Sequence, residues 1–127
     1  MVPDASSAPK PVGPYTPIVR AGNWLVCSGQ LGLSDGKLVE GLAPQVTQAL
    51  ANAEILLHSE GASLHDVVKT TVFLADIADY RAMNEAYVSA FGEHRPARSA
   101  FAVAGLPLGA AVEIEVWAFT DPGRSPS

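Results

Sequence analysis

Three charged side chains near the C-terminus have types and spacing that could do chemistry. Arg98 follows Pro96 and directly precedes an uncharged stretch of sequence. Because Pro96 fixes the local backbone and lacks an N–H donor, we expect Arg98 at the start of a strand and not on a solvated helix. A guanidinium beside apolar strands can hold a carboxylate through two parallel hydrogen bonds. An ordinary surface or interface ion pair is the alternative interpretation of Arg98.

Glu113 and Glu115 lie two residues apart in the last apolar segment. A strand in this segment would point both carboxylates to the same face of a sheet. If that face lines a pocket, one carboxylate could orient a water molecule or accept its proton. If it faces solvent, the two glutamates belong to an ordinary hydrated surface. The spacing leaves both interpretations open.

Other familiar chemistries lack part of their residue set. His58 and Glu60 form the H-x-E half of a zinc-deaminase signature, but the P-C-x-x-C half is missing because Cys27 is the only cysteine. The three histidines show no metal-ligand spacing, and no glycine-rich nucleotide loop is complete. Cys27 lies in an apolar run, which is typical of a buried, inert thiol. Spacing alone predicts neither a metal site nor a catalytic triad.

Length and charge restrict the class of protein. The chain has 127 residues, which predicts a single domain over 1–127 with flexible ends at 1–12 and 120–127. Its 8 Lys+Arg against 13 Asp+Glu give a net charge of −5, which argues against a nucleic-acid partner. The sequence shows no secretory signal and no apolar stretch long enough to span a membrane. We therefore expect a cytoplasmic protein without a membrane partner.

The elements that must position the charged residues follow from the apolar pattern. Runs in which apolar residues alternate, bounded by turn residues, predict strands. Apolar residues spaced three and four apart predict two helices that end at Gly61 and Gly92. Asp79 is the predicted N-cap of the second helix. The pattern predicts an α+β fold with one mixed sheet and both helices on the same face. The last two strands would form a C-terminal hairpin near Arg98. The expected order is β-β-β-α-β-α-β-β, over residues 17–20, 24–29, 38–39, 43–59, 67–75, 79–91, 98–104 and 112–119.

The second face of this sheet is also apolar. The central segment 67–75 carries apolar residues on both alternations, which are Val68, Val72 and Leu74 against Val67, Phe73 and Ala75. Two helices cover only one face, so a single copy would expose a large apolar patch. Such patches usually mark an interface. The pattern therefore predicts a homo-oligomer, without specifying the number of copies.

Several motifs together resemble one known family. The C-terminal motif is PARS at 96–99, GLP at 105–107 and VEIE at 112–115, and the middle motif is GASLHDVVKTTVFL at 61–74. Further matches are GPY at 13–15, CSGQ at 27–30, and Gln48, Leu50 and Asn52. With this set, which extends over residues 13–119, the chain resembles the Rid family, the YjgF-like reactive intermediate (enamine/imine) deaminases.

The resemblance implies a chorismate-mutase-like fold assembled as a homotrimer, with a cleft between each pair of subunits. It implies hydrolysis of short 2-imino acids, such as 2-iminobutanoate and 2-iminopropanoate, without a metal or organic cofactor. Arg98 would hold the substrate carboxylate and Glu113 would position the attacking water. The pocket would be lined by Tyr15, Ser28, Gly29 and Asn84. Some family members have Cys two residues after the motif Arg, whereas this chain has Ala100, which argues against thiol chemistry there.

Two other classes of function stay open beside imine hydrolysis. The same cleft could act on another small carboxylate-bearing substrate, such as an aminomuconate, an aminoacrylate or a carbamate. The chain could instead be a ligand-binding or RNA-acting member of the family. The net charge of −5 and the lack of a basic stripe weigh against RNA.

Overall fold

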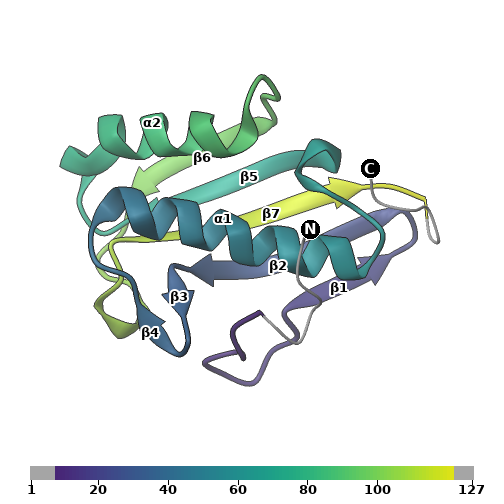
Figure 1. Ribbon diagram of the computed structural model, residues 1–127, viewed down its shortest axis with the longest axis horizontal. Helices are drawn as coiled ribbons and strands as arrows, with labels where there is room; N and C mark the ends of the chain where they lie inside the picture. The colour runs from purple at the N-terminus through teal and green to yellow at the C-terminus, as the bar shows by residue number, and fades with distance from the viewer. Residues whose placement is uncertain (1–7, 122–127) are drawn as a thin grey trace.

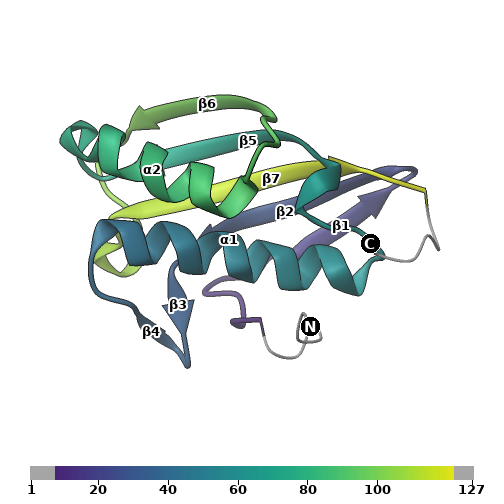
Figure 2. The same ribbon diagram turned by 45° about the horizontal axis from the view of Figure 1, so that its top comes forward.

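Two helices lie side by side on one face of a mixed sheet (Figures 1 and 2). The computed structural model describes residues 8–121; the predicted flexible ends lie partly outside this range, at 1–7 and 122–127. The helices are α1 (Leu42–Ser59) and α2 (Tyr80–Phe91). The strands are β1 (Ile18–Ala21), β2 (Trp24–Leu31), β3 (Leu33–Ser34), β4 (Lys37–Leu38), β5 (Val67–Leu74), β6 (Ala97–Ala102) and β7 (Val112–Phe119). The predicted fold class is confirmed.

The five-stranded sheet has the order β1-β2-β7-β5-β6, in which β6 is an edge strand. All neighbours are antiparallel except β5 and β6, which are parallel. The predicted C-terminal hairpin is therefore wrong, because β6 and β7 lie on opposite sides of β5. The connection between them, which contains the short 3₁₀ helix η4 (Pro107–Gly109), crosses the end of β5 to reach the other side.

The third predicted strand does not belong to this sheet. It is β4, which pairs with β3 in a separate two-stranded sheet. The side chain of Asn52 on α1 explains the separation, since its Nδ2 donates to the carbonyl oxygens of Leu31 (3.1 Å) and Leu33 (3.0 Å). Gly32 lies between them against Gln45, where an added Cβ would be 2.6 Å from the Gln45 Cα. The helix thus turns the chain out of the main sheet at this point.

The helix limits agree with the apolar spacing. Helix α1 buries Val46, Ala49 and Leu50 among its sheet-facing residues and ends before Gly61, whose φ is +80°. Asp79 occupies the predicted N-cap position of α2, but its side chain makes no capping hydrogen bond. Asp76 caps the preceding 3₁₀ helix η3 (Ile77–Asp79) instead, where Oδ1 accepts from the Ala78 N–H at 2.9 Å. The capping contact lies one turn earlier than predicted.

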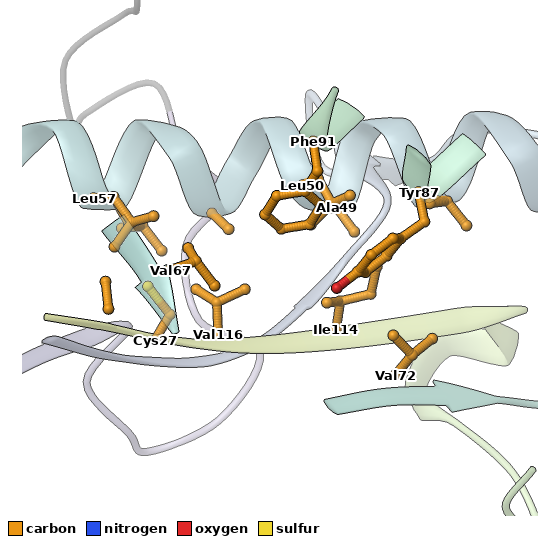
Figure 3. Close-up of a cluster of buried hydrophobic side chains, with 14 of the residues drawn as sticks. Cys27, Ala49, Leu50, Leu57, Val67, Val72, Tyr87, Phe91, Ile114 and Val116 are labelled. Carbon is orange, nitrogen blue, oxygen red and sulfur yellow. The ribbon is translucent and has the colours of Figure 1, made fainter. Parts of the chain in front are cut away.

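The core fills the space between the helices and the sheet (Figure 3). Side chains of Leu50, Leu57 and Phe91 point from the helices toward Val116 and Ile114 on β7. The predicted alternation of β5 is wrong at its start, because a bulge between Val67 and Lys69 interrupts it. It turns Val67 into the core with Val72 and Leu74 and leaves Val68 44% exposed. Period two holds only after the bulge, from Thr70 onward.

The helices leave the other face of the sheet bare, and we call it the open face. Large apolar side chains lie on it at one end, with Trp24 packed edge-to-face against Trp117 and Phe119. Phe73 and Phe101 form a second edge-to-face pair, with ring centroids 5.5 Å apart. This is the apolar surface from which an oligomer was predicted. Within residues 8–121, no helix is both long and apolar enough to cross a membrane.

Candidate active site

The carboxylate of Glu113 lies in a cavity at the open face. Glu113 is on β7, half-buried, and its side chain lies against Gly29 of β2. Gly29 lies within an irregularity of the β2–β7 pairing, between Cys27 and Gln30, and an added Cβ there would lie 2.8 Å from the Glu113 Cδ. The cavity, of about 260 Å³, is called the Glu113 cavity and is lined by Val12, Tyr15, Ser28, Gly29, Leu31, Pro107 and Glu113.

The surroundings of Glu113 favour its protonated form more than water does. Burial raises the pKa of Glu113, and the like charge of Glu115 on the same face of β7 raises it further. Phe73 lies directly opposite Glu113 on β5 and adds an aromatic neighbour. Such a carboxylate, beside a cavity large enough for water and a small ligand, can orient a water molecule or take its proton.

Backbone contacts hold Tyr15 and Ser28 at this cavity. The Ser28 Oγ donates to the Thr16 carbonyl oxygen at 2.7 Å, and the Ser28 N–H donates to the Pro17 carbonyl oxygen at 2.8 Å. The Tyr15 hydroxyl accepts from the Val12 N–H at 3.2 Å. These bonds fold the segment before β1 over the irregular part of β2. Four predicted site residues, which are Tyr15, Ser28, Gly29 and Glu113, are thus brought together.

The guanidinium of Arg98 lies under α2 at the sheet edge. Its Cζ is 4.8 Å from the ring centroid of Tyr87 and 5.6 Å from that of Tyr80. Nη2 donates to the Tyr80 hydroxyl at 3.1 Å, and Nη1 lies 3.8 Å from the Met83 Sδ. Within residues 8–121, Arg98 forms no ion pair. The two tyrosine rings thus hold the guanidinium by cation–π contacts, and its positive charge can still pair with an anionic ligand.

A second cavity, of about 370 Å³, opens beside Arg98. We call it the Arg98 cavity, and its lining residues are Asn84, Tyr87, Val88, Arg95, Pro96 and Arg98. The Oδ1 of Asn84 is buried and has no hydrogen-bond partner within residues 8–121. Burial raises the pKa of Tyr87, whose hydroxyl is 2.8 Å from the Thr70 Oγ1; this hydrogen bond and the charges of Arg98 and Arg95 act in the opposite direction. Tyr87 therefore stays a neutral hydroxyl in the cavity wall at physiological pH.

Arg98 and Glu113 do not meet within one protomer. Arg98 pairs with Thr70, whose side chain faces the helices, and Glu113 pairs with Phe73 on the open face. Their Cα atoms are two strands and three residues apart, or about 14 Å. The six predicted site residues therefore form two groups: Arg98 with Asn84, and Glu113 with Tyr15, Ser28 and Gly29.

Sequence reasoning missed part of the Arg98 surroundings. Tyr80, Met83 and Tyr87 lie on α2 and were not among the predicted site residues; Met83 and Tyr87 are buried. Their contacts with Arg98 arise because β6 runs beneath α2, which no local spacing shows. Ala100 faces the helices like Arg98 and packs against the core. Within residues 8–121, no group of three or more His, Cys, Asp or Glu side chains could hold a metal ion.

Comparison with known proteins gives consistent matches over most of the chain. The family described as endoribonuclease L-PSP matches residues 5–120. The human protein named 2-iminobutanoate/2-iminopropanoate deaminase is 42% identical over 120 residues, which cover 92% of this chain and 88% of the human one. Reactive Intermediate Deaminase A, chloroplastic, of Arabidopsis thaliana is 45% identical over 111 residues, covering 85% of this chain and 59% of the plant protein.

Solved structures agree with these sequence matches. RidA from an Antarctic Psychrobacter bacterium superposes with a TM-score of 0.88 at 39% identity, covering 94% of this chain and 98% of that one. TdcF of E. coli with bound serine superposes with a TM-score of 0.87 at 32% identity, covering 95% and 98%. The likeness thus extends over nearly the whole of each of these two structures.

Proposed function

The chain belongs to the Rid, or YjgF-like, family, and we propose on this premise that it hydrolyses short 2-imino acids and their enamine tautomers to 2-oxo acids and ammonia. The substrates are of the size of 2-iminobutanoate and 2-iminopropanoate. The names of the human and Arabidopsis relatives support this reaction. The bound serine of the E. coli relative also supports a small amino-acid-like ligand.

The active site is shared between two copies of the chain. The single observation that carries this proposal is that Arg98 and Glu113 lie on opposite faces of the sheet, each beside its own cavity. When the Arg98 edge of one copy meets the open face of the next, both groups reach one substrate. This contact is head-to-tail, and repeating it gives a closed ring when the rotation between neighbouring copies divides a full turn. The family resemblance supports three copies in this ring.

The chemistry then follows from the two half-sites. Arg98 binds the substrate carboxylate by charge-assisted hydrogen bonds and so fixes the imine carbon. Glu113 of the neighbouring copy orients a water molecule and accepts its proton as the oxygen attacks that carbon. The C–O bond forms and the proton passes to nitrogen; the C–N bond then breaks as the new hydroxyl gives its proton to the departing ammonia, so that ammonium and the 2-oxo acid are released. An iminium is electrophilic by itself, so no covalent nucleophile is needed.

The first experiment measures turnover of 2-iminobutanoate, generated in the cuvette by a threonine dehydratase. Wild-type protein should accelerate the formation of 2-oxobutanoate, and Arg98→Ala should abolish the acceleration while the far-UV spectrum and assembly mass stay unchanged. If Arg98→Ala accelerates the reaction as well as the wild type, the carboxylate contact is wrong.

A mixing experiment tests whether the site is shared. Arg98→Ala and Glu113→Gln chains alone should each keep only a residual activity, about 100-fold or more below wild type, but a refolded equimolar mixture should recover about a quarter of wild-type activity. The reason is that a random interface joins one intact Arg98 with one intact Glu113 in one case of four. A refolded mixture that stays inactive would refute the shared site. Re-formed mixed assemblies are the required control, checked by mass spectrometry of tagged chains.

The other functions considered for the sequence make different predictions. An alternative small carboxylate substrate would give Arg98-dependent turnover in a panel of aminomuconates, aminoacrylates and carbamates but not with 2-iminobutanoate. An RNA-acting protein would bind RNA with a steep inverse dependence on salt.

A further inference from the structure

A second guanidinium lines the Arg98 cavity. Arg95 and Arg98 are two of the chain's eight Lys and Arg residues, and both border the same space of about 370 Å³. The other lining residues are the amide Asn84, the phenol Tyr87 and the apolar Val88 and Pro96, so no acidic side chain of the described residues lines it. In a chain of net charge −5, this cavity therefore concentrates positive charge.

Local bonds hold Arg95 in place at the end of α2. Its Nη1 donates to the carbonyl oxygens of Gly92 and His94, the latter at 3.0 Å. Gly92, with φ at +66°, ends the helix, and Pro96 restricts the backbone on the other side. Within residues 8–121, Arg95 forms no ion pair, and its Nη2 and Nε make no hydrogen bond. Two sets of N–H donors thus remain for a ligand.

Two cations in one cavity suit a ligand with two negative groups. One carboxylate on Arg98 would pair that cation and leave the exposed guanidinium of Arg95, at the rim of the same cavity, without an anionic partner. A second carboxylate removes this imbalance. Arg95 and Arg98 are three residues apart on an extended segment, so their Cα atoms are at most about 10 Å apart, and their long side chains can converge. Val88 and the Tyr87 ring can cover the short carbon chain between the two carboxylates.

We infer that the preferred substrates are 2-imino diacids with one or two methylene groups between the imine carbon and the distal carboxylate. Arg98 binds the carboxylate next to the imine carbon, and Arg95 binds the distal one. This inference rests on the proposed hydrolysis and adds its substrate class. The distal carboxylate takes no part in the bond changes, which stay the same: water adds to the imine carbon and ammonium leaves. Arg95 is therefore a specificity-determining residue.

The test compares two substrates generated by amino-acid oxidases, 2-iminoglutarate as the diacid and 2-iminobutanoate as the monoacid. Wild type should have a kcat/KM about 10-fold or more higher for the diacid. Arg95→Gln should lower kcat/KM for the diacid by about 10- to 100-fold, mainly through KM, because it removes one charge-assisted pair. The same variant should change the monoacid value by less than about twofold, because a monoacid does not reach Arg95.

Arg81→Gln is the matched control, since it removes an equal charge from the exposed surface of α2, the helix that precedes Arg95, away from the cavity lining. It should leave both substrates unaffected. Binding of the products gives a readout without catalysis: by calorimetry, 2-oxoglutarate should bind more tightly than 2-oxobutanoate, and Arg95→Gln should remove the difference.

Each outcome has a separate meaning. Turnover of the monoacid without a diacid preference overturns this inference and leaves the proposed hydrolysis standing. A preference for branched aliphatic imino acids over both probes also overturns it, because Val88 and Pro96 would then define the cavity. An equal loss for both substrates in Arg95→Gln would show a structural role only and would overturn it as well. No turnover of any imine would refute the proposed function itself.

Discussion

Replacing Gly29 by alanine should separate catalysis from stability. The added Cβ would lie 2.8 Å from the Glu113 Cδ and 2.9 Å from its Cγ, whereas ordinary contact begins at 3.4 Å. The Cδ must therefore move by at least 0.6 Å, and the closer carboxylate oxygen must move farther. Because the Glu113 side chain can rotate, the backbone need not shift. The φ of Gly29 is not in the left-handed region, so alanine causes no backbone strain.

The size of the effect follows from the displacement. Moving a catalytic group by about 1 Å can lower the rate about 100-fold, which corresponds to about 2.7 kcal/mol in the activation barrier. We expect this loss in kcat, with little change in KM because Arg98 is untouched. The free energy of unfolding should change by less than about 1 kcal/mol. The measurements are steady-state turnover of 2-iminobutanoate and thermal unfolding by circular dichroism.

Two further variants make this prediction refutable. Gly105→Ala is the control, because among residues 8–121 no atom outside the two adjacent residues lies within 4 Å of its added Cβ, and its backbone angle is ordinary; it should keep wild-type activity. In a Glu113→Gln background, Gly29→Ala should cost almost nothing more, since both changes act on the same carboxylate. If Gly29→Ala lowers kcat equally in the wild-type and Glu113→Gln backgrounds, Gly29 does not act through Glu113 and the reasoning fails.

Other predictions concern assembly, pH and the thiol. Trp117→Glu puts a charge on the apolar open face. The assembly expected for three 13.2 kDa chains, about 40 kDa, should therefore dissociate in sedimentation velocity and lose activity. A variant that stays assembled and active would contradict the role of this face. Burial and then Glu115 raise the pKa of Glu113, so activity should fall as pH drops through this raised value. Glu115→Gln should shift the acidic limb of the kcat profile to lower pH. A limb that does not move would show that another group titrates there. Since folding raises this pKa, the folded state binds the proton more tightly than the unfolded state, and ionised Glu113 destabilises the fold at neutral pH. Glu113→Gln should therefore raise Tm at pH 7, with the difference vanishing in acid; a difference independent of pH would contradict this. Burial raises the pKa of Cys27 to about 12, so a thiol reagent at pH 8 should label it only after denaturation, and fast labelling of native protein would show an open core.

Much of the fold could be predicted because its signals are local. The spacing of Val46, Ala49 and Leu50 specifies the buried face of α1, and the glycine after each helix specifies its end. The exceptions have non-local causes. Asn52 on α1 draws the β2–β3 connection out of the main sheet, and this contact joins residues about twenty positions apart. The bulge at Val67 also depends on pairing with β7 and leaves no mark in the apolar pattern.

The candidate site was predicted by residue type but not by arrangement. Arg98 and Glu113 were both selected, one by its position after Pro96 and the other by its spacing from Glu115. Their separation depends on β6 lying parallel to β5 at the edge of the sheet, while β7 runs antiparallel on its other side. Chain order gives no information on which side of β5 each strand lies. The contacts of Arg98 with Tyr80 and Tyr87 were missed for the same reason.

Because Arg98 and Glu113 lie on opposite faces of one sheet, the proposed shared site would make activity a property of the population of chains. A newly synthesised chain should then be inactive until it assembles with others, so the dissociation constant of the proposed ring should limit turnover at low expression. Specific activity should therefore fall on dilution and recover on concentration. A defective chain that exchanges into a ring would disable one shared site and leave the sites formed by its neighbours working. The loss of activity would therefore increase in proportion to the share of defective chains.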